Sequence, residues 1–319
     1  MKYAPSALVI AMLLCLHSLA SADDLGSDVV AARVTELPIA FTQATFGEVH
    51  PADASAAIKA WAECLAREQK TQLDPEPFLV SGLQELRSLF VDGALDVAIA
   101  TVPEFFALDV DPASVTLFSS TRDGDATERY LILTHKDSGR SDLASLRGAT
   151  LQAFENPRAA MGLHWVDVQL LDAGLPSPRE HFGKIIETRK LSGTVLPVFF
   201  RQVDACVVTE YGFQTLVELN PQIGQQLQVV ARSEPFVPTL GFFHPAFDAS
   251  RRRDAVDAIL SVPNSEAGLQ ILRLFQVDAF GEVSASSLDS ARALLARSRL
   301  YQEAHSTAKP LETLVGAEP

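Results

Sequence analysis

The apolar residues of this chain form short runs that alternate with segments of helical spacing. Runs at residues 37–41, 77–80 and 95–100 have the length of buried strands. Between the first two, apolar residues of the segment 54–65 recur at three- and four-residue steps, which predicts a helix. A second helix is expected to begin near Leu83. Three strands alternating with two helices predict a parallel sheet.

A second alternation of the same kind begins after the first one. Its expected strands are 130–135, 150–154, 184–188 and 205–208, and its expected helices are 157–172 and about 192–202. The runs 228–231 and 239–243 follow, and from Asp248 onward the pattern predicts helices only. The pattern therefore predicts an α/β protein of two lobes, with one lobe built from both ends of the chain. We place that lobe at residues 30–130 plus 235–319 and the other at 131–234.

Length and composition agree with two globular lobes. The chain has 319 residues, of which 47% are hydrophobic and 21% charged. Its formal net charge of −14 argues against nucleic acid or an anionic membrane as a partner. After Cys15, only Cys64 and Cys206 remain. We favour two buried free thiols, and the alternative is a disulfide that pins the lobes together.

The first 22 residues read as a cleavable export signal. Lys2 precedes an apolar segment at residues 7–16, and Ala20-Ser21-Ala22 supplies the small residues of a cleavage site. We predict a cut after Ala22 and an exported protein. The alternative, a membrane anchor, needs about 20 apolar residues.

The segment 149–165 is the centre of the predicted binding cleft. It reads as a strand that leads directly into a helix, with Asn156 as the cap and Pro157 in the first turn. Such a strand-to-helix turn leaves backbone N–H groups free to receive a polar or anionic ligand. Ligands of open parallel sheets lie beyond the carboxyl ends of the strands, so we expect the cleft there.

Several segments, taken in order, resemble a known family. They are Leu86…Leu89-Phe90…Gly93…Leu95-Asp96-Val97-Ala98, then Leu146-Arg147-Gly148, Leu170-Leu171-Asp172-Ala173-Gly174-Leu175, Val203-Asp204-Ala205, residues 233–238 and residues 268–275. Over about residues 37–301 the chain resembles the phosphate/phosphite/phosphonate-type periplasmic substrate-binding proteins of ABC importers. The resemblance implies the type II periplasmic-binding-protein fold. In that fold each lobe is a mixed, mainly parallel sheet flanked by helices, and hinge strands, expected here near 130–135 and 229–238, join the two.

One segment departs from the family pattern. Phosphonate-binding members carry a Ser/Thr-rich turn ending in glycine at the helix start that holds the ligand. Here the corresponding residues 156–162 contain no hydroxyl, and Pro157 removes one N–H donor. The resemblance therefore implies the fold but not phosphonate specificity.

Each candidate ligand-binding residue has a structural alternative. Arg158 can bind a carboxylate or phosphate in a bidentate manner, or be a solvated surface arginine. Hydroxyls at strand ends can bind a ligand or close turns, and Ser192 can cap a helix. Glu210 can pair with an ammonium group or be solvated, and Tyr211 can stack on a ligand. The full predicted set is Thr42, Thr45, Thr101, Glu104, Asn156, Arg158, Ala159, Ala160, Ser192, Gly193, Thr194, Glu210 and Tyr211.

Together with the resemblance, these observations predict a monomeric periplasmic solute-binding protein. It is expected to capture a small ligand for an ABC permease, and an anion is one candidate class of ligand. No metal-ligand spacing, cofactor motif or nucleophile motif is present in the sequence, so we expect no metal, no cofactor and no catalysis. Two alternatives remain open. One is a ligand-binding accessory protein for a membrane sensor kinase, and the other is a secreted enzyme on the same scaffold.

Overall fold

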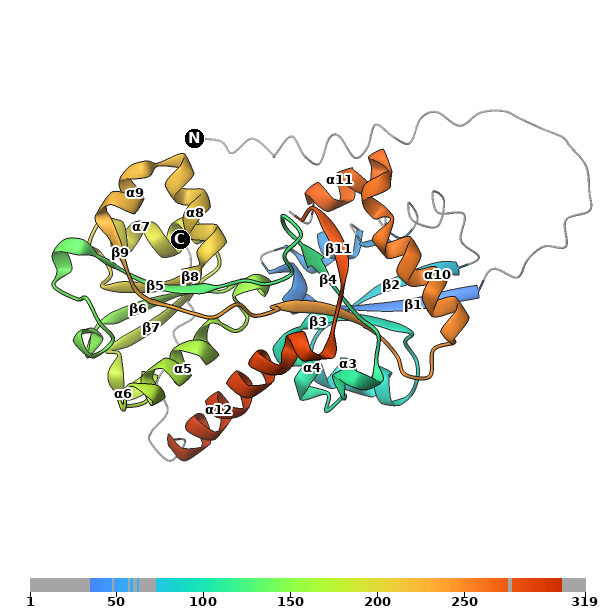
Figure 1. Ribbon diagram of the computed structural model, residues 1–319, viewed down its shortest axis with the longest axis horizontal. Helices are drawn as coiled ribbons and strands as arrows, with labels where there is room; N and C mark the ends of the chain where they lie inside the picture. The colour runs from blue at the N-terminus through green and yellow to red at the C-terminus, as the bar shows by residue number, and fades with distance from the viewer. Residues whose placement is uncertain are drawn as a thin grey trace, which may run out of the picture. The chain divides into compact units, whose positions relative to one another are not determined.

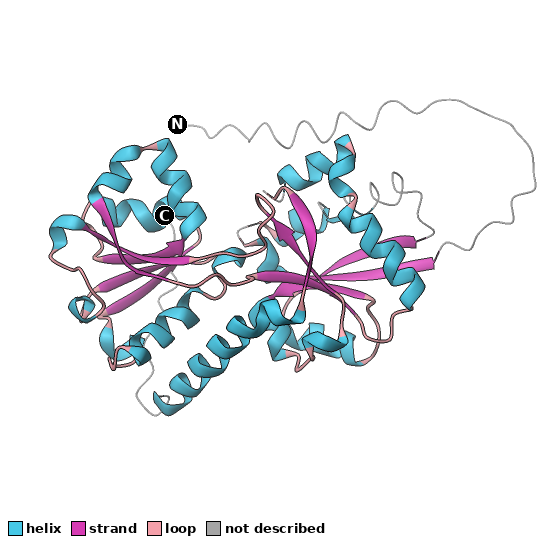
Figure 2. Cartoon of the chain, in the orientation of Figure 1, coloured by secondary structure: helices cyan, strands magenta, loops and turns pink. Residues whose placement is uncertain are grey.

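A computed structural model describes residues 35–47, 49–56, 58–59, 62, 73–274 and 277–305. The predicted export signal and Cys64 lie outside these described residues. The described chain forms two separate sheets, each flanked by helices (Figures 1 and 2). None of its described helices is both long and apolar enough to cross a membrane.

The first sheet has six strands in the order β11-β4-β10-β3-β1-β2. Their bounds are β1 Thr35–Thr42, β2 Leu73–Val80, β3 Val97–Thr101, β4 Leu117–Thr121, β10 Thr239–Phe243 and β11 Ala279–Val283. Strand β1 runs parallel to both β2 and β3, which confirms the predicted parallel unit. Strand β10 pairs antiparallel with β3 and with β4, and β11 pairs antiparallel with β4, so the complete sheet is mixed.

Both faces of the first sheet are covered, which explains why its predicted strands were nearly continuous apolar runs. In β1, Leu37, Ile39 and Phe41 belong to one core cluster, whereas Ala40 belongs to another. This is the two-residue alternation of a strand. The helices around this sheet are α3 Leu83–Val91, α4 Val102–Ala107, α10 Ala249–Leu260, α11 Glu266–Leu274 and α12 Asp289–His305.

The second sheet has five strands in the order β7-β6-β8-β5-β9. Their bounds are β5 Tyr130–His135, β6 Thr150–Phe154, β7 Lys184–Thr188, β8 Ala205–Thr209 and β9 Leu227–Arg232, and the helices are α5 Gly162–Asp172, α6 Pro178–His181, α7 Leu191–Phe199, α8 Glu210–Leu219 and α9 Pro221–Gln226. The predicted strands of this sheet are confirmed. Leu151 packs in one core cluster with Trp165 of α5, and Cys206 packs in another with Val195 of α7.

Two strands were not predicted. Strand β11 contradicts the expectation that the chain is only helical after Asp248, and β4 was also missed. Strand β11 contains Gly281 and Glu282 at the edge of the sheet, and the second half of β4 is Ser119-Ser120-Thr121. Neither segment forms an apolar run, so the sequence pattern did not reveal them. Their strand conformation depends on tertiary pairing, of β4 with β10 and β11 and of β11 with β4.

The two sheets are joined by residues 122–129 and 233–238, which meet in an antiparallel bridge between Glu128 and Phe236 (Figure 1). The two backbone N–H···O bonds of this bridge measure 2.8 and 2.9 Å. The expected hinge at 130–135 is wrong, because that segment is fully buried as β5 inside the second sheet.

The C-terminal helix α12 contacts elements of both predicted lobes. Tyr301 donates to the carbonyl of Leu175 at 2.9 Å, just beyond α5, and Arg292 lies over the ring of Phe106 in α4 at 5.4 Å. The sequence boundaries assigned α12 to the lobe of the first sheet. Those boundaries stay a prediction.

Candidate functional site

A cavity of about 330 Å³ is lined by residues of the first sheet and by the turn that precedes α5. Its apolar wall includes Phe41, Phe46, Ile99, Phe118, Leu240 and Phe280. Its polar lining comprises Thr45, Ser119, Ser120, Arg122, Asn156, Arg158 and Thr239. Several of the apolar residues also belong to the core cluster between the first sheet and α10, so the cavity is a continuation of that core.

The turn before α5 has the capped geometry that the sequence predicted. The Asn156 side chain accepts a hydrogen bond from the N–H of Arg158 at 3.0 Å, and Pro157 follows the cap. The capped segment is a short 3-10 turn, Pro157–Ala159, and α5 itself begins only at Gly162. The predicted continuous helix from 157 is therefore interrupted. The hydroxyl of Tyr130 donates to the carbonyl of Arg158 at 3.0 Å and fixes the turn to the second sheet.

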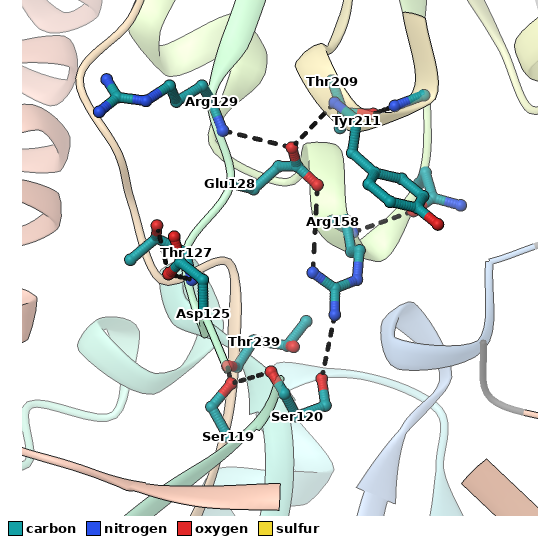
Figure 3. A network of polar contacts seen from close by, with 12 residues as sticks. Ser119, Ser120, Asp125, Thr127, Glu128, Arg129, Arg158, Thr209, Tyr211 and Thr239 are labelled. Atoms are coloured by element: carbon teal, nitrogen blue, oxygen red, sulfur yellow. Dashed lines mark hydrogen bonds and ion pairs between the residues drawn. The ribbon is translucent and has the colours of Figure 1, made fainter. Parts of the chain in front are cut away.

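Arg158 is buried and faces the cavity, so it is not a solvated surface arginine. Only 12% of its side chain is exposed. Its Nη2 donates to Oγ of Ser120 at 3.4 Å, and its Nη1 lies 4.0 Å from Oε2 of Glu128 (Figure 3). Burial lowers the pKa of the Arg158 guanidinium, nearby Arg122 lowers it further, and Glu128 opposes both effects.

Glu128 is a buried carboxylate that the sequence reasoning missed. Its side chain is 5% exposed, and its Oε1 accepts from the N–H groups of Tyr211 at 3.4 Å and Arg129 at 3.3 Å (Figure 3). Burial raises the pKa of Glu128, although these N–H groups and the arginines Arg158 and Arg122 act in the opposite direction. Its position directly before the apolar strand β5 was the available sequence signal.

Tyr211 lies beside this cluster, whereas Glu210 points elsewhere. The guanidinium of Arg122 stacks over the Tyr211 ring at 4.1 Å from its centre, which connects the end of β4 to the start of α8. Glu210 instead pairs with Arg232 at 3.1 Å. Neither Glu210 nor Tyr211 is among the residues that line the 330 Å³ cavity.

Thr42, Thr101 and Glu104 contact one another at the ends of β1 and β3. Oε2 of Glu104 accepts from the hydroxyls of Thr42 and Thr101, each at 2.8 Å, and from the N–H of Thr101 at 2.9 Å. Thr101 and Glu104 thereby form the capping box of α4. Thr45 lines the cavity, and its hydroxyl donates to the carbonyl of Thr42 at 2.7 Å. Ligand contacts of these four residues stay a prediction.

The remaining predicted residues lie away from the main cavity. Ser192, Gly193 and Thr194 form the first turn of α7, where the Thr194 hydroxyl bonds to that of Thr188 at 2.7 Å. Ala159 and Ala160 line a smaller cavity of about 120 Å³, which shares Asn156 with the larger one. The carboxylates of Glu155 and Glu187 also line this small cavity, and burial, with a lesser contribution from Glu155, raises the pKa of Glu187.

The polar groups of the main cavity are suited to an anion, and its apolar wall is suited to a hydrocarbon group. A guanidinium with a neighbouring serine hydroxyl can donate several hydrogen bonds to a carboxylate or to a tetrahedral oxyanion. Among the described residues, no group of three or more His, Cys, Asp or Glu side chains is arranged to hold a metal ion.

Similar solved structures share the fold over most of the chain. They include XAC2383 from Xanthomonas citri bound to a chloride ion, with a TM-score of 0.60, 15% identity, 84% of this chain covered and 99% of that one. A binding-protein component of an ABC phosphonate transporter from Pseudomonas aeruginosa matches with a TM-score of 0.58 and 13% identity, over 88% of this chain and 91% of that one. PhnD1 from Prochlorococcus marinus in complex with methylphosphonate matches with a TM-score of 0.57 and 14% identity, over 82% of this chain and 97% of that one. No curated protein sequence matches the chain.

A family model supplies the assignment that these distant structures alone do not. It matches residues 47–288, which include the complete second sheet, every strand of the first sheet except β1, and most residues that line the cavity. The match confirms the resemblance seen in the sequence, and with it a small-molecule ligand, an ABC permease as partner and a periplasmic location. The chain belongs to the family of phosphonate-type periplasmic substrate-binding proteins of ABC transporters.

Proposed function

We propose that this protein binds a small organic anion with an apolar substituent and delivers it to its ABC permease. The observation that carries the proposal is the corner formed by Arg158 and Ser120, which opens into a cavity walled mainly by phenylalanine and aliphatic side chains. The anionic group would contact Arg158, and the hydrocarbon part would lie against Phe41 and Phe118.

The size and chemistry of the cavity support this ligand class. A volume of about 330 Å³ is at the small end of ligand cavities in proteins and suits a single ring or a short chain. Residues 156–162 carry no hydroxyl, so the turn before α5 lacks the side-chain donors expected for a phosphonate-specific site. In the proposal Arg158 and the hydroxyl of Ser120 supply these donors.

We further propose that the chain is exported with cleavage after Ala22, acts as a monomer, and releases its ligand unchanged. The sensor-kinase alternative would use the same binding site and differ only in the membrane partner.

Titration calorimetry with three related probes tests the ligand class. Phenylmethanesulfonate has the charge and the ring, methanesulfonate has only the charge, and benzyl alcohol has only the ring. We expect the first to bind most tightly, because burying the ring adds about 1.5–3 kcal/mol. Arg158→Ala should weaken its binding by about 1.5–3 kcal/mol through the loss of charge-assisted hydrogen bonds.

Arg253→Ala is the matched control, because Arg253 is an exposed residue of α10. It should leave the affinity unchanged. Equal affinity of the Arg158→Ala variant and the parent protein would contradict the proposed site, and tighter binding of benzyl alcohol than of the sulfonate would contradict the anion.

A further inference from the structure

Glu128 stands behind Arg158 as seen from the cavity. Arg158 lines the cavity, and Glu128 is not among the described residues that do so. Their closest approach is 4.0 Å, and the opposite side of the guanidinium contacts Ser120 (Figure 3). A ligand anion and the Glu128 carboxylate would therefore share one buried guanidinium from two sides.

The charges at this corner restrict what the cavity can accept. The ionised carboxylate of Glu128 offsets the charge of the Arg158 guanidinium, so the pair by itself carries no net charge. Arg158 therefore compensates the negative charge of a ligand only in part, and a ligand with two negative charges leaves more uncompensated charge in this largely buried place than a ligand with one. An uncompensated buried charge is costly, so the second charge reduces affinity.

We propose that Glu128 makes this binding site selective for anions of single charge, such as sulfonates and carboxylates, over dianions of the same shape. This inference rests on the proposed function, because it requires the anion to bind at Arg158. In this inference Glu128, on the segment between the two sheets, does not contact the ligand itself. It determines through Arg158 which ligand charge is preferred.

The isosteric substitution Glu128→Gln separates charge from structure. A glutamine carbonyl can still accept from the N–H groups of Tyr211 and Arg129, which are the hydrogen bonds that Oε1 of Glu128 receives. Only the negative charge behind Arg158 is removed. Glu218→Gln is the matched control, because Glu218 is exposed on α8 and its replacement changes the total charge equally.

The probes are phenylmethanesulfonate and benzylphosphonate, which share the ring and the three-oxygen head. At about pH 8.5 the sulfonate carries one negative charge and the phosphonate two. In the parent protein we expect the sulfonate to bind more tightly. In Glu128→Gln the ratio of phosphonate affinity to sulfonate affinity should rise about tenfold or more, because Arg158 is then no longer offset by the Glu128 carboxylate and compensates more of the second negative charge. Glu218→Gln should keep the parent ratio.

A pH titration of the parent protein provides a second measurement that needs no variant. The sulfonate keeps its charge at all relevant pH values, so its affinity should rise as Glu128 takes up a proton at a pH above the usual range of a glutamate. Arg158 and Arg122 act on Glu128 through their charges, and Tyr211 and Arg129 act through their backbone N–H groups. The other titratable group beside Glu128 is buried Tyr130, whose pKa burial and the Glu128 charge raise.

The possible results decide between the two proposals. Sulfonate binding with an unchanged phosphonate ratio in Glu128→Gln overturns the role of Glu128 and leaves the proposed function standing. If Glu128→Gln does not fold, a sulfonate affinity that is flat with pH overturns that role instead. If the parent protein binds neither anion, both proposals fail.

Discussion

At the scale of single residues, a glycine determines how closely the wall of the cavity can pack. Gly241 lies in β10 opposite Phe118 of β4, and both residues line the cavity. A Cβ atom at position 241 would overlap the Phe118 ring. The ring therefore occupies space that only a residue without a side chain leaves open, and the cavity depends on that packing.

Gly241→Ala should destabilise the protein by about 1–3 kcal/mol, because the Phe118 ring must move within a packed core. The displaced ring also changes the cavity, so the affinity for phenylmethanesulfonate should fall. Denaturant unfolding and calorimetry measure the two effects. Gly281→Ala in neighbouring β11 is the control, because its new methyl group meets only a methyl of Thr121 at 3.3 Å. Equal stability losses in the two variants would contradict the role of the ring contact.

Glu104 accepts hydrogen bonds from the hydroxyls of Thr101 and Thr42, and only the first of these bonds was predictable from sequence spacing. The pattern Thr101-x-x-Glu104 is a capping-box signature, and the structure contains that capping box. The sequence alone therefore contained the structural role of two predicted ligand residues. The additional bond from Thr42 to Glu104 joins residues 62 positions apart, and no spacing rule predicts it.

At the scale of elements, α12 is fastened to α5 by a buried polar network. The Ser298 hydroxyl donates to Oδ2 of Asp167 at 2.6 Å and lies 2.9 Å from Nδ1 of His164. Because that hydroxyl has one proton, and Asp167 receives it, Nδ1 of His164 is the donor in the second bond. Gln302 also donates to Asp167, at 2.7 Å. These hydrogen bonds replace the ones that the same polar groups would make to water if α12 did not cover them.

Protonation of His164 should destabilise the protein, because the added proton places a positive charge in a buried position. Burial lowers the pKa of His164 below its ordinary value of 6.5, and Asp167 opposes the shift in part. Below about pH 6.5 the unfolded chain then binds a proton that the folded chain does not, so stability falls as the pH falls. The slope is at most about 1.4 kcal/mol per pH unit. Denaturant unfolding between about pH 7.5 and about pH 5 measures it.

His164→Gln removes this titration and keeps a side-chain donor for Ser298. We expect the variant to lose less stability than the parent protein over the same pH range. The comparison isolates His164, because Asp167, whose pKa burial raises, remains in both proteins. Identical pH slopes would show that His164 does not titrate with folding.

At the scale of the whole molecule, contacts between elements of the two sheets surround the cavity. Arg158 reaches Ser120, and Arg122 stacks on Tyr211. The two segments that join the sheets are paired through Glu128 and Phe236. A ligand that contacts both Arg158 and the wall formed by the first sheet favours the arrangement in which these elements are close, which is a shift of population.

Ligand binding should therefore both reduce the radius of gyration of the protein and raise its free energy of unfolding. At a ligand concentration of about 100 times the dissociation constant, the free energy of unfolding should rise by about 2.7 kcal/mol. Small-angle scattering with and without phenylmethanesulfonate should show a smaller radius of gyration in the complex. Arg158→Ala should reduce both changes at equal ligand concentration. Binding with unchanged scattering would contradict closure of the two lobes around the ligand.

The sequence by itself determined the buried strands and the capped turn before α5. Strands β5 and β6 are largely buried, whereas β7 is a partly exposed edge strand, and all three were predicted at their true bounds. The cap at Asn156 was predictable because it joins residues two apart. The sequence also shows directly that residues 156–162 contain no hydroxyl group.

Only the tertiary structure decided which side chains share the cavity. Strands β4 and β11 carry polar residues and depend on pairing with distant strands, β4 with β10 and β11 and β11 with β4. No local pattern therefore revealed Ser119, Ser120 or the Arg122 that follows. Arg158 was a candidate from the start, but its burial depends on Glu128 and Ser120, which lie 30 and 38 residues earlier in the chain. Periodicity reports how one element meets its neighbours, whereas a binding site is made by residues that folding alone brings together.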